Sequence, residues 1–219
     1  MKRSLTAALV YMTVAAFVAA GQTPTRPAPP LADPHAGHGA RAQKAQEHPP
    51  AQKYFSDIEL LDQDGRKVRF YSDMLKGKTV VVNAFFTTCA SVCPPMNRNM
   101  EKIQEALGPR LGKEVFLISI SVDPETDTPP RIKEYARKFN ARPGWTFLTG
   151  RKENVDWALY KLGQYVESKD DHTTVVIVGN EATGLWKKAF GLAKLADLVQ
   201  IVESVANDKG EATKTGGTK

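Results

Sequence analysis

Both cysteines of this 219-residue chain lie in one short stretch, four residues apart, as Cys89 and Cys93 in TCASVCP. At this spacing the two sulfurs can converge as a disulfide when oxidised, or as a pair of soft metal ligands when reduced. The alternative is a purely structural disulfide, but a short loop gains little stability from cross-linking. The pair therefore predicts redox or metal chemistry.

A predicted strand becomes a predicted helix at the cysteines. Residues 80–86 (VVVNAFF) are mainly β-branched and aromatic without polar alternation, which is typical of a strand buried on both faces of a parallel sheet. Pro94 and Pro95 suit the first turn of a helix, which the apolar spacing continues to Leu107. Free N–H groups and the helix dipole favour a thiolate here, and we expect Cys93 to feel this most.

The histidine His172 directly precedes another predicted strand, at residues 175–178. In a thioredoxin-like fold, which the order of the predicted elements indicates, this strand runs antiparallel to the central strand at residues 80–86. The start of the strand at 175–178 therefore lies beside the end of the central strand. We therefore expect His172 to lie next to Cys89 and Cys93. The alternative is a hydrogen-bonded structural histidine at a strand edge.

The remaining patterns predict a single α/β domain over residues 54–206. A hairpin is expected around Asp64-Gly65, and a second buried strand at 115–122 implies a parallel crossover from the first. Further patterns predict a helix capped by Thr128, a short strand or edge at 145–148, a short helix at 155–162, a hairpin over 175–190 and a closing helix at 195–205. This order predicts a thioredoxin-like fold with an added N-terminal β-hairpin.

The segments outside this domain predict export. Residues 1–20 combine a basic start with an apolar run from residue 5, as expected of a signal peptide or an N-terminal membrane anchor. Either would place the domain on the periplasmic side of the inner membrane, anchored through residues 5–20 or soluble. Residues 21–53 predict a disordered Pro- and Ala-rich linker, and 207–219 a disordered tail.

Three histidines, His35, His38 and His48, lie in the linker, where His35 and His38 offer at most weak binding of a transition metal. The composition, 42% hydrophobic and 25% charged, is that of a soluble globular protein. The net charge of +6 is modest and forms no aromatic-basic stripe, so we predict no nucleic-acid partner. Outside the cytoplasm, a thiol reductant must keep the two cysteines reduced.

Two thiolates and one imidazole form a donor set that suits a soft ion of low coordination number such as Cu(I). A structural zinc site would need a fourth ligand, and none is evident. Asp170 and Asp171 precede His172 and either orient its imidazole or form a solvated acidic loop.

Three segments resemble, in the same order, motifs of the Sco/SenC family of copper chaperones for cytochrome c oxidase. They are the Cys-x-x-x-Cys-Pro motif at 89–94, the acidic stretch SVDPETDTP at 121–129 and Asp171-His172-Thr173. The resemblance spans about residues 55–205. It implies that Cys89, Cys93 and His172 bind copper, and that the partner is the oxidase subunit carrying the dinuclear copper A site.

The resemblance also implies that Asp123, Glu125 and Asp127 stabilise the surroundings of the site, whereas the residues alone suggest turn and cap positions. Ala90 departs from the family pattern, in which many members have proline, and this difference concerns loop stiffness more than ligation.

These observations favour a copper metallochaperone, not an enzyme, as the first hypothesis. The second is a thiol-disulfide oxidoreductase in which Cys89 and Cys93 reduce the cysteines of the oxidase copper site. A peroxiredoxin is a weaker hypothesis, because the Cys-x-x-x-Cys turn and the absence of proline after Pro143 argue against a peroxide pocket.

Overall fold

The computed structural model describes residues 51–210, apart from the side chain of Gln52. The predicted signal peptide or anchor, most of the linker with its three histidines, and residues 211–219 of the predicted tail lie outside the described residues. Within the described part, no helix combines the length and the apolar character that crossing a membrane would require.

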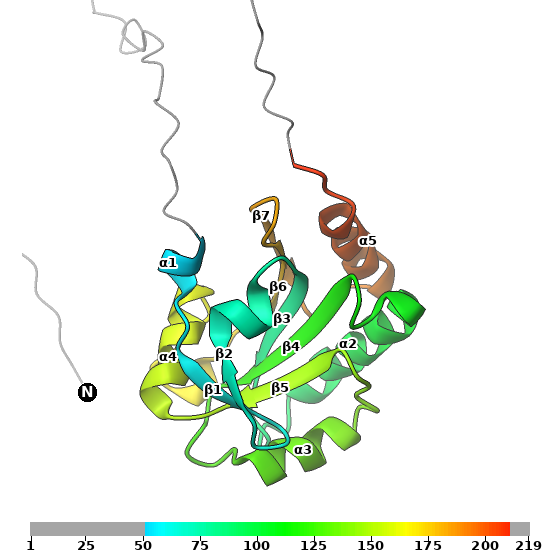
Figure 1. Ribbon diagram of the computed structural model, residues 1–219. Coiled ribbons are helices and arrows are strands. Elements are labelled where there is room, and N and C mark those ends of the chain that lie inside the picture. The colour runs from blue at the N-terminus through cyan, green and yellow to red at the C-terminus, as the bar shows by residue number, and fades with distance from the viewer. Residues whose placement is uncertain (1–50, 211–219) are drawn as a thin grey trace, which may run out of the picture. The chain divides into compact units, whose positions relative to one another are not determined.

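A seven-stranded sheet in the order β2-β1-β5-β4-β3-β6-β7 forms the centre of the domain (Figure 1). Strands β3, β4 and β5 are parallel, whereas β6 runs antiparallel to β3. The strands are β1 (Glu59–Asp62), β2 (Lys67–Arg69), β3 (Thr79–Phe85), β4 (Val115–Ser121), β5 (Trp145–Thr149), β6 (Val175–Asn180) and β7 (Leu185–Phe190).

Five α-helices accompany the sheet: α1 (Ala51–Phe55), α2 (Cys93–Leu107), α3 (Pro129–Arg137), α4 (Lys152–Lys161) and α5 (Leu195–Ala206). Shorter helical turns occupy Phe70–Leu75, Gly108–Arg110 and Lys169–Asp171. The β3-α2-β4 crossover followed by β6-β7-α5 is the thioredoxin-like arrangement, so the predicted fold class is confirmed.

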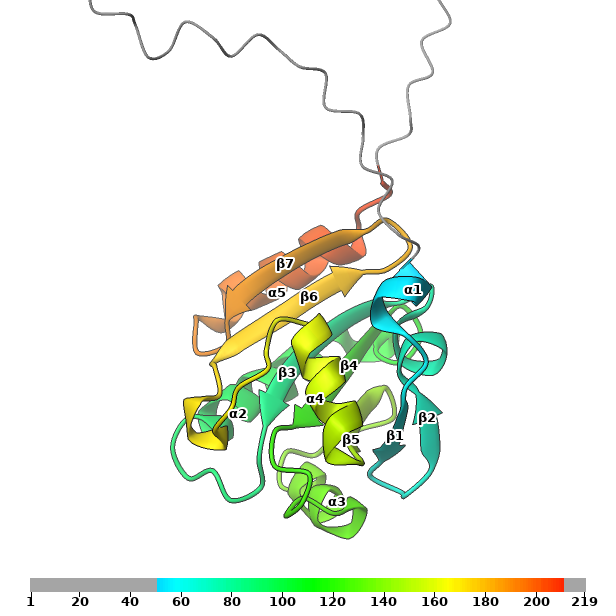
Figure 2. The same cartoon turned by 90° about the vertical axis from the view of Figure 1, so that its left-hand side faces the viewer.

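Helices cover both faces of the sheet, as the two views in Figures 1 and 2 show. Buried side chains of α2, α3 and α5 form one core with one face of the sheet, and those of α1 and α4 form a second core with the other face. Strand β3 is consequently buried along its whole length. This double burial explains why its sequence is apolar without alternation.

Several local features differ from the expectations. Strand β5 lies inside the sheet, because β1 pairs with its outer side and β4 with its inner side. Helix α1 begins at Ala51, within the predicted linker, and Phe70–Leu75 forms a π-helical turn that the sequence did not predict. Thr128 is the N-cap of α3, but its side chain makes no capping bond; Pro130, at the second position of the helix, offers no N–H group to it.

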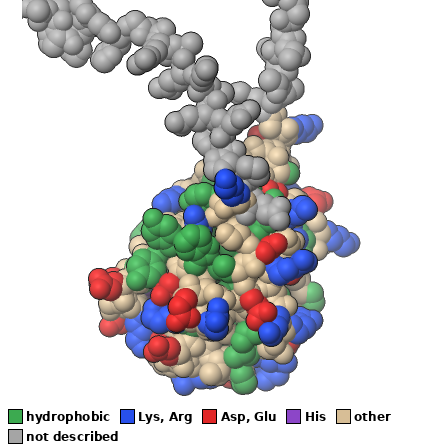
Figure 3. Space-filling view, turned by 60° about the vertical axis from the view of Figure 1, so that its left-hand side comes forward, with side chains coloured by type: hydrophobic (Ala, Val, Ile, Leu, Met, Phe, Trp, Pro, Cys, Tyr) green, Lys and Arg blue, Asp and Glu red, His purple; other side chains and the backbone are tan. Residues whose placement is uncertain are grey.

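The outer side of α1 and α4 retains exposed aromatic side chains, Tyr54, Trp157 and Tyr160. Figure 3 views this side of the domain, where hydrophobic side chains gather among charges of both signs. The Lys161 ammonium lies 4.5 Å from the ring centre of Tyr54 and 4.4 Å from that of Trp157. Cation–π contacts therefore hold this lysine between two rings of the surface.

A chain of buried hydrogen bonds ties α2 to the sheet and to α3. Asn97 donates to the Tyr135 hydroxyl at 3.0 Å and accepts from the Asn83 amide at 3.0 Å. The Ser119 hydroxyl donates to Asn83 at 2.6 Å and accepts from the Trp145 indole at 2.9 Å. This chain fixes the position of α2, whose first residue is Cys93, over β3 and β4.

Asn97→Ala is expected to lower the free energy of unfolding by about 2–3 kcal/mol, because it leaves the Asn83 amide and the Tyr135 hydroxyl buried without partners. Urea denaturation measures the change. The control is Asn154→Ala, which removes a solvent-exposed bond to the Glu59 carbonyl and is expected to change stability by less than about 0.5 kcal/mol. Equal losses in the two variants would contradict the structural role of the buried chain.

Candidate metal centre

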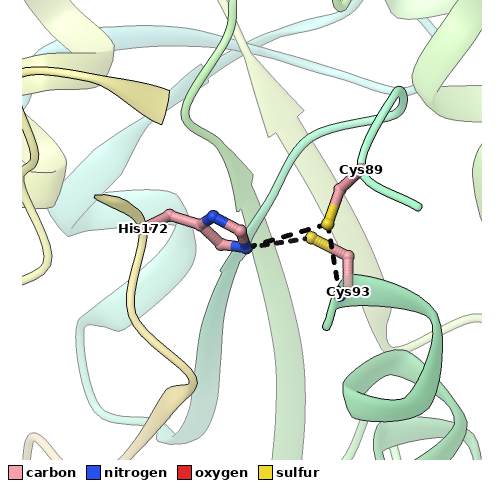
Figure 4. Close-up of side chains that lie close together, drawn as sticks. All are labelled: Cys89, Cys93 and His172. Carbon is pink, nitrogen blue, oxygen red and sulfur yellow. Dashed lines mark hydrogen bonds between the residues drawn. The ribbon is translucent and has the colours of Figure 1, made fainter. Parts of the chain in front are cut away.

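Cys89, Cys93 and His172 converge at one end of the sheet (Figure 4). The His172 Nε2 atom lies 3.2 Å from the Cys93 sulfur and 4.0 Å from the Cys89 sulfur, and the three ligand atoms all lie within 4.8 Å of one another. The antiparallel pairing of β3 with β6 brings the histidine to this end. The predicted proximity of His172 to the cysteines is therefore confirmed.

The two cysteines differ in burial and are both free thiols. Cys93 opens α2 and is fully buried, with Pro94 and Pro95 in the first turn as predicted. Cys89 precedes it in the connecting loop, with 8% of its surface exposed, and its sulfur accepts a hydrogen bond from the Cys93 backbone N–H at 3.4 Å. Cys93 is thus the inner and Cys89 the outer sulfur.

The pKa values of the two thiols shift in opposite directions. Burial raises the pKa of the Cys93 thiol far above its usual range, and its hydrogen bond to Cys89 adds to the rise. Burial also raises the pKa of Cys89, but hydrogen bonds from Cys93 and Ser91 outweigh it, so that this pKa lies below its ordinary value. We expected the helix N-terminus to favour a thiolate most at Cys93, yet the pKa of this thiol is raised, because its burial in the core is the largest influence on it.

The imidazole of His172 is oriented by a backbone carbonyl. Its Nδ1 atom lies 2.9 Å from the Lys169 carbonyl oxygen, which can only accept a hydrogen bond. Nδ1 therefore carries the proton, and the lone pair on Nε2 faces the two sulfurs. The ring of Phe86 packs against the imidazole at 82°, with 5.0 Å between ring centres.

The acidic residues before His172 do not orient the imidazole. The exposed Asp170 and Asp171 donate their backbone N–H groups to Ser168. Within the described residues, neither carboxylate bonds to His172, whose Nδ1 is paired with Lys169 instead. The interpretation as a solvated acidic loop fits both residues.

The acidic turn after β4 contacts the loop that carries the cysteines and the segment that carries His172. The Asp127 carboxylate is fully buried and accepts hydrogen bonds from the backbone and hydroxyl of Thr87 and from the Ser121 hydroxyl. The Asp123 carboxylate pairs with Lys169 at 2.7 Å, whereas Glu125 is exposed. The residues alone indicated turn and cap positions, whereas the family resemblance implied that these acids stabilise the surroundings of the site, and the buried contact of Asp127 with Thr87 agrees with that implication.

Two sulfurs and one imidazole nitrogen can hold a soft ion of low coordination number. Among the described residues, these three form the only group of three or more Cys, His, Asp or Glu side chains placed to share a metal. A structural zinc site would require a fourth protein ligand, so the donor set fits copper better than zinc.

Comparisons with known proteins agree on one family. The family model described as SCO1/SenC matches residues 46–207. The SCO1 protein homolog of Bacillus subtilis is 34% identical over 118 residues, which cover 52% of this chain and 60% of that protein. The chain thus matches less than two thirds of the length of this relative.

Two solved structures share the fold at similar identity. BsSco, described as a member of the Sco family of cytochrome c oxidase assembly proteins with a disulfide switch, is 27% identical with a TM-score of 0.58, covering 69% of this chain and 92% of that chain. ScoI of Bradyrhizobium japonicum with copper bound is 26% identical with a TM-score of 0.57, covering 68% and 97%. Because the SCO1/SenC match takes in well over half of its residues, this chain belongs to the SCO1/SenC family.

Proposed function

We propose that this protein is an exported copper metallochaperone that serves the assembly of the copper A centre of cytochrome c oxidase. The observation that carries the proposal is the convergence of Cys89, Cys93 and the Nε2 lone pair of His172 within 4.8 Å. Two relatives support it, since B. japonicum ScoI has been solved with copper bound and BsSco is described as belonging to a family of oxidase assembly proteins.

In this proposal copper is the cargo, held by the two sulfurs and the imidazole nitrogen. Cys93 is the buried ligand, and the partly exposed His172 together with the outer Cys89 is the side from which a client ligand can approach. Only three protein donors hold the ion, so a thiolate or imidazole of the oxidase subunit can add before a chaperone ligand leaves. Copper then passes by ligand exchange.

The redox state of the cysteine pair controls this site. Oxidation of the two thiols to a disulfide releases two electrons and two protons and removes both sulfur ligands. A dithiol reductant must return the two electrons before copper can bind again. Export through residues 1–20, with the domain on the periplasmic side of the inner membrane, belongs to the same proposal and rests on the sequence alone.

The reduced full chain is expected to bind one Cu(I) tightly, and Cys89→Ser, Cys93→Ser and His172→Ala are each expected to weaken binding, because each removes one of three donors. Competition with a Cu(I) chelator measures the dissociation constants. A variant with all three linker histidines, His35, His38 and His48, changed to alanine is the control and should bind as the wild type does. Unchanged affinity in His172→Ala would contradict the site assignment.

A second candidate function is a thiol-disulfide oxidoreductase acting on the cysteines of the oxidase subunit. The observation that favours it is the asymmetry of the pair, in which Cys89 is the outer sulfur with a lowered pKa and Cys93 is buried with a raised pKa. Such a pair suits attack on a disulfide by Cys89 and release of the mixed disulfide by Cys93.

Iodoacetamide is expected to alkylate Cys89 faster than Cys93, with a pH midpoint below that of an ordinary thiol, because the thiolate is the reactive form and the pKa of Cys89 is lowered. Mass spectrometry of peptides from time points assigns the site. A Cys93→Ser variant should trap a mixed disulfide through Cys89 with a peptide carrying the oxidised cysteine pair of the client. Faster alkylation of Cys93, or failure to trap the adduct, would count against the reductase function.

A further inference from the structure

The segment between α4 and β6 carries His172 and is joined to the sheet near its two ends, where the Gln164 side chain donates to the Val175 carbonyl and the Thr174 carbonyl accepts from the Gly191 N–H. Most of its residues, 165–171, are exposed, and the backbone hydrogen bonds of the turn Lys169–Asp171 stay within the segment. Within the described part of the chain, the Lys169 side chain makes the one hydrogen bond that joins residues 165–171 to another element. Between the two ends of the segment, this lysine side chain therefore bonds the stretch that leads to His172 to another element of the domain.

Lys169 contacts His172 in two ways and the rest of the domain in two more. Its carbonyl oxygen accepts from Nδ1 of the imidazole at 2.9 Å and from the His172 backbone N–H at 3.2 Å. Its ammonium lies 2.7 Å from an oxygen of Asp123 and 5.5 Å from the ring centre of Phe86, the same ring that packs against the imidazole. One residue thus connects the imidazole to the body of the domain.

Asp123 is itself held firmly. Its backbone N–H donates to the Ser121 hydroxyl at 3.0 Å, and its carbonyl accepts from the N–H groups of Thr126 and Asp127. Asp127 in turn binds Thr87, two residues before Cys89. The turn at residues 123–127 therefore contacts both the segment that carries the histidine and the loop that carries the cysteines.

We propose that the ion pair between Lys169 and Asp123 is a clamp that positions His172 against the two sulfurs and so sets how tightly copper is held. Both are positioning residues, not ligands. An ordinary surface ion pair contributes little to stability. Here the Asp123 side chain is only 13% exposed. No other described hydrogen bond joins residues 165–171 to another element, so nothing replaces this pair when it is removed. The effect on copper rests on the proposed function, whereas the effect on the position of the histidine does not.

The copper experiment uses the reduced full chain and a Cu(I) chelator. Lys169→Met keeps the aliphatic stem beside Phe86 but removes the ammonium, and Asp123→Asn removes the negative charge. Each is expected to raise the copper dissociation constant about tenfold, the effect typical of groups that orient a metal ligand. The double variant should be no weaker than either single variant, since both remove one interaction. Lys169→Arg should retain most of the affinity.

Lys152→Met is the matched control. Lys152 pairs with Asp156 at 2.6 Å, with side chains 47% and 28% exposed, close to the geometry of the proposed clamp at 2.7 Å, 40% and 13%. Lys152 opens α4, which follows β5 at the same end of the sheet, so the variant loses one positive charge on the same side of the domain. It should bind copper as the wild type does. An equal loss in Lys152→Met would assign the effect to overall charge and overturn the clamp.

A second readout needs no metal. In the copper-free reduced chain, Lys169→Met should speed hydrogen exchange at the His172 amide, with amides of α2 unchanged as an internal reference, and Lys169→Arg should restore the slow exchange. Faster exchange together with a wild type that binds no copper would support the clamp while refuting the copper function. If the wild type binds copper tightly, and Lys169→Met changes neither the copper affinity nor the hydrogen exchange at the His172 amide, the clamp is overturned and the copper function stands.

Discussion

The site depends on the burial of one carboxylate. Asp127 is fully buried, and a buried charge is costly unless hydrogen-bond donors surround it. Thr87, two residues after β3, and Ser121, the last residue of β4, provide those donors. Because Thr87 belongs to the loop that follows β3 and leads to Cys89, these hydrogen bonds fix the start of the cysteine loop against the turn after β4. The charge also contributes to the raised pKa of Cys93, although burial of the thiol is the larger cause.

The two halves of the site are built differently. The cysteines belong to the core: Cys93 opens α2, which the buried chain through Asn97, Asn83 and Ser119 ties to the sheet. The histidine belongs to a mostly exposed segment. In the proposed function, this division suits a carrier that must also give up its ion, because one ligand can move away while the sulfur pair keeps its geometry. The same division allows redox change at the sulfurs without rebuilding the segment of His172.

The sequence predicted those features that depend on strongly patterned segments. The apolar run of β3, the hairpin of β6 and β7 and the position of His172 before β6 were sufficient to place Cys89, Cys93 and His172 together. Features that depend on contacts between distant segments were not accessible. The order of the thiol pKa values follows from the depth of Cys93 in the core, which local helix-terminus reasoning does not include.

Other features were missed for the same reason. Asp127 occurs in a stretch that suits any turn, and only the folded chain shows that it is buried against Thr87. Strand β5 is internal only because β1, far away in sequence, pairs with it. The roles of turn residues and of edge positions are set by tertiary packing, so a single sequence gives their location without their contacts.

Both ends of the described part of the chain lie at the end of the sheet opposite Cys89, Cys93 and His172. Ala51 and Gly184 line a common cavity there, and the Asn180 side chain at the end of β6 donates to backbone carbonyls of Val205 and Asp208 after α5. Strand β6 separates this end from the ligands by its six residues, about 20 Å. A fluorophore or a surface-coupling tag attached near Ala51 or Gly210 therefore leaves the end of the sheet with Cys89, Cys93 and His172 free, which makes this domain suited to immobilisation with that end directed outward.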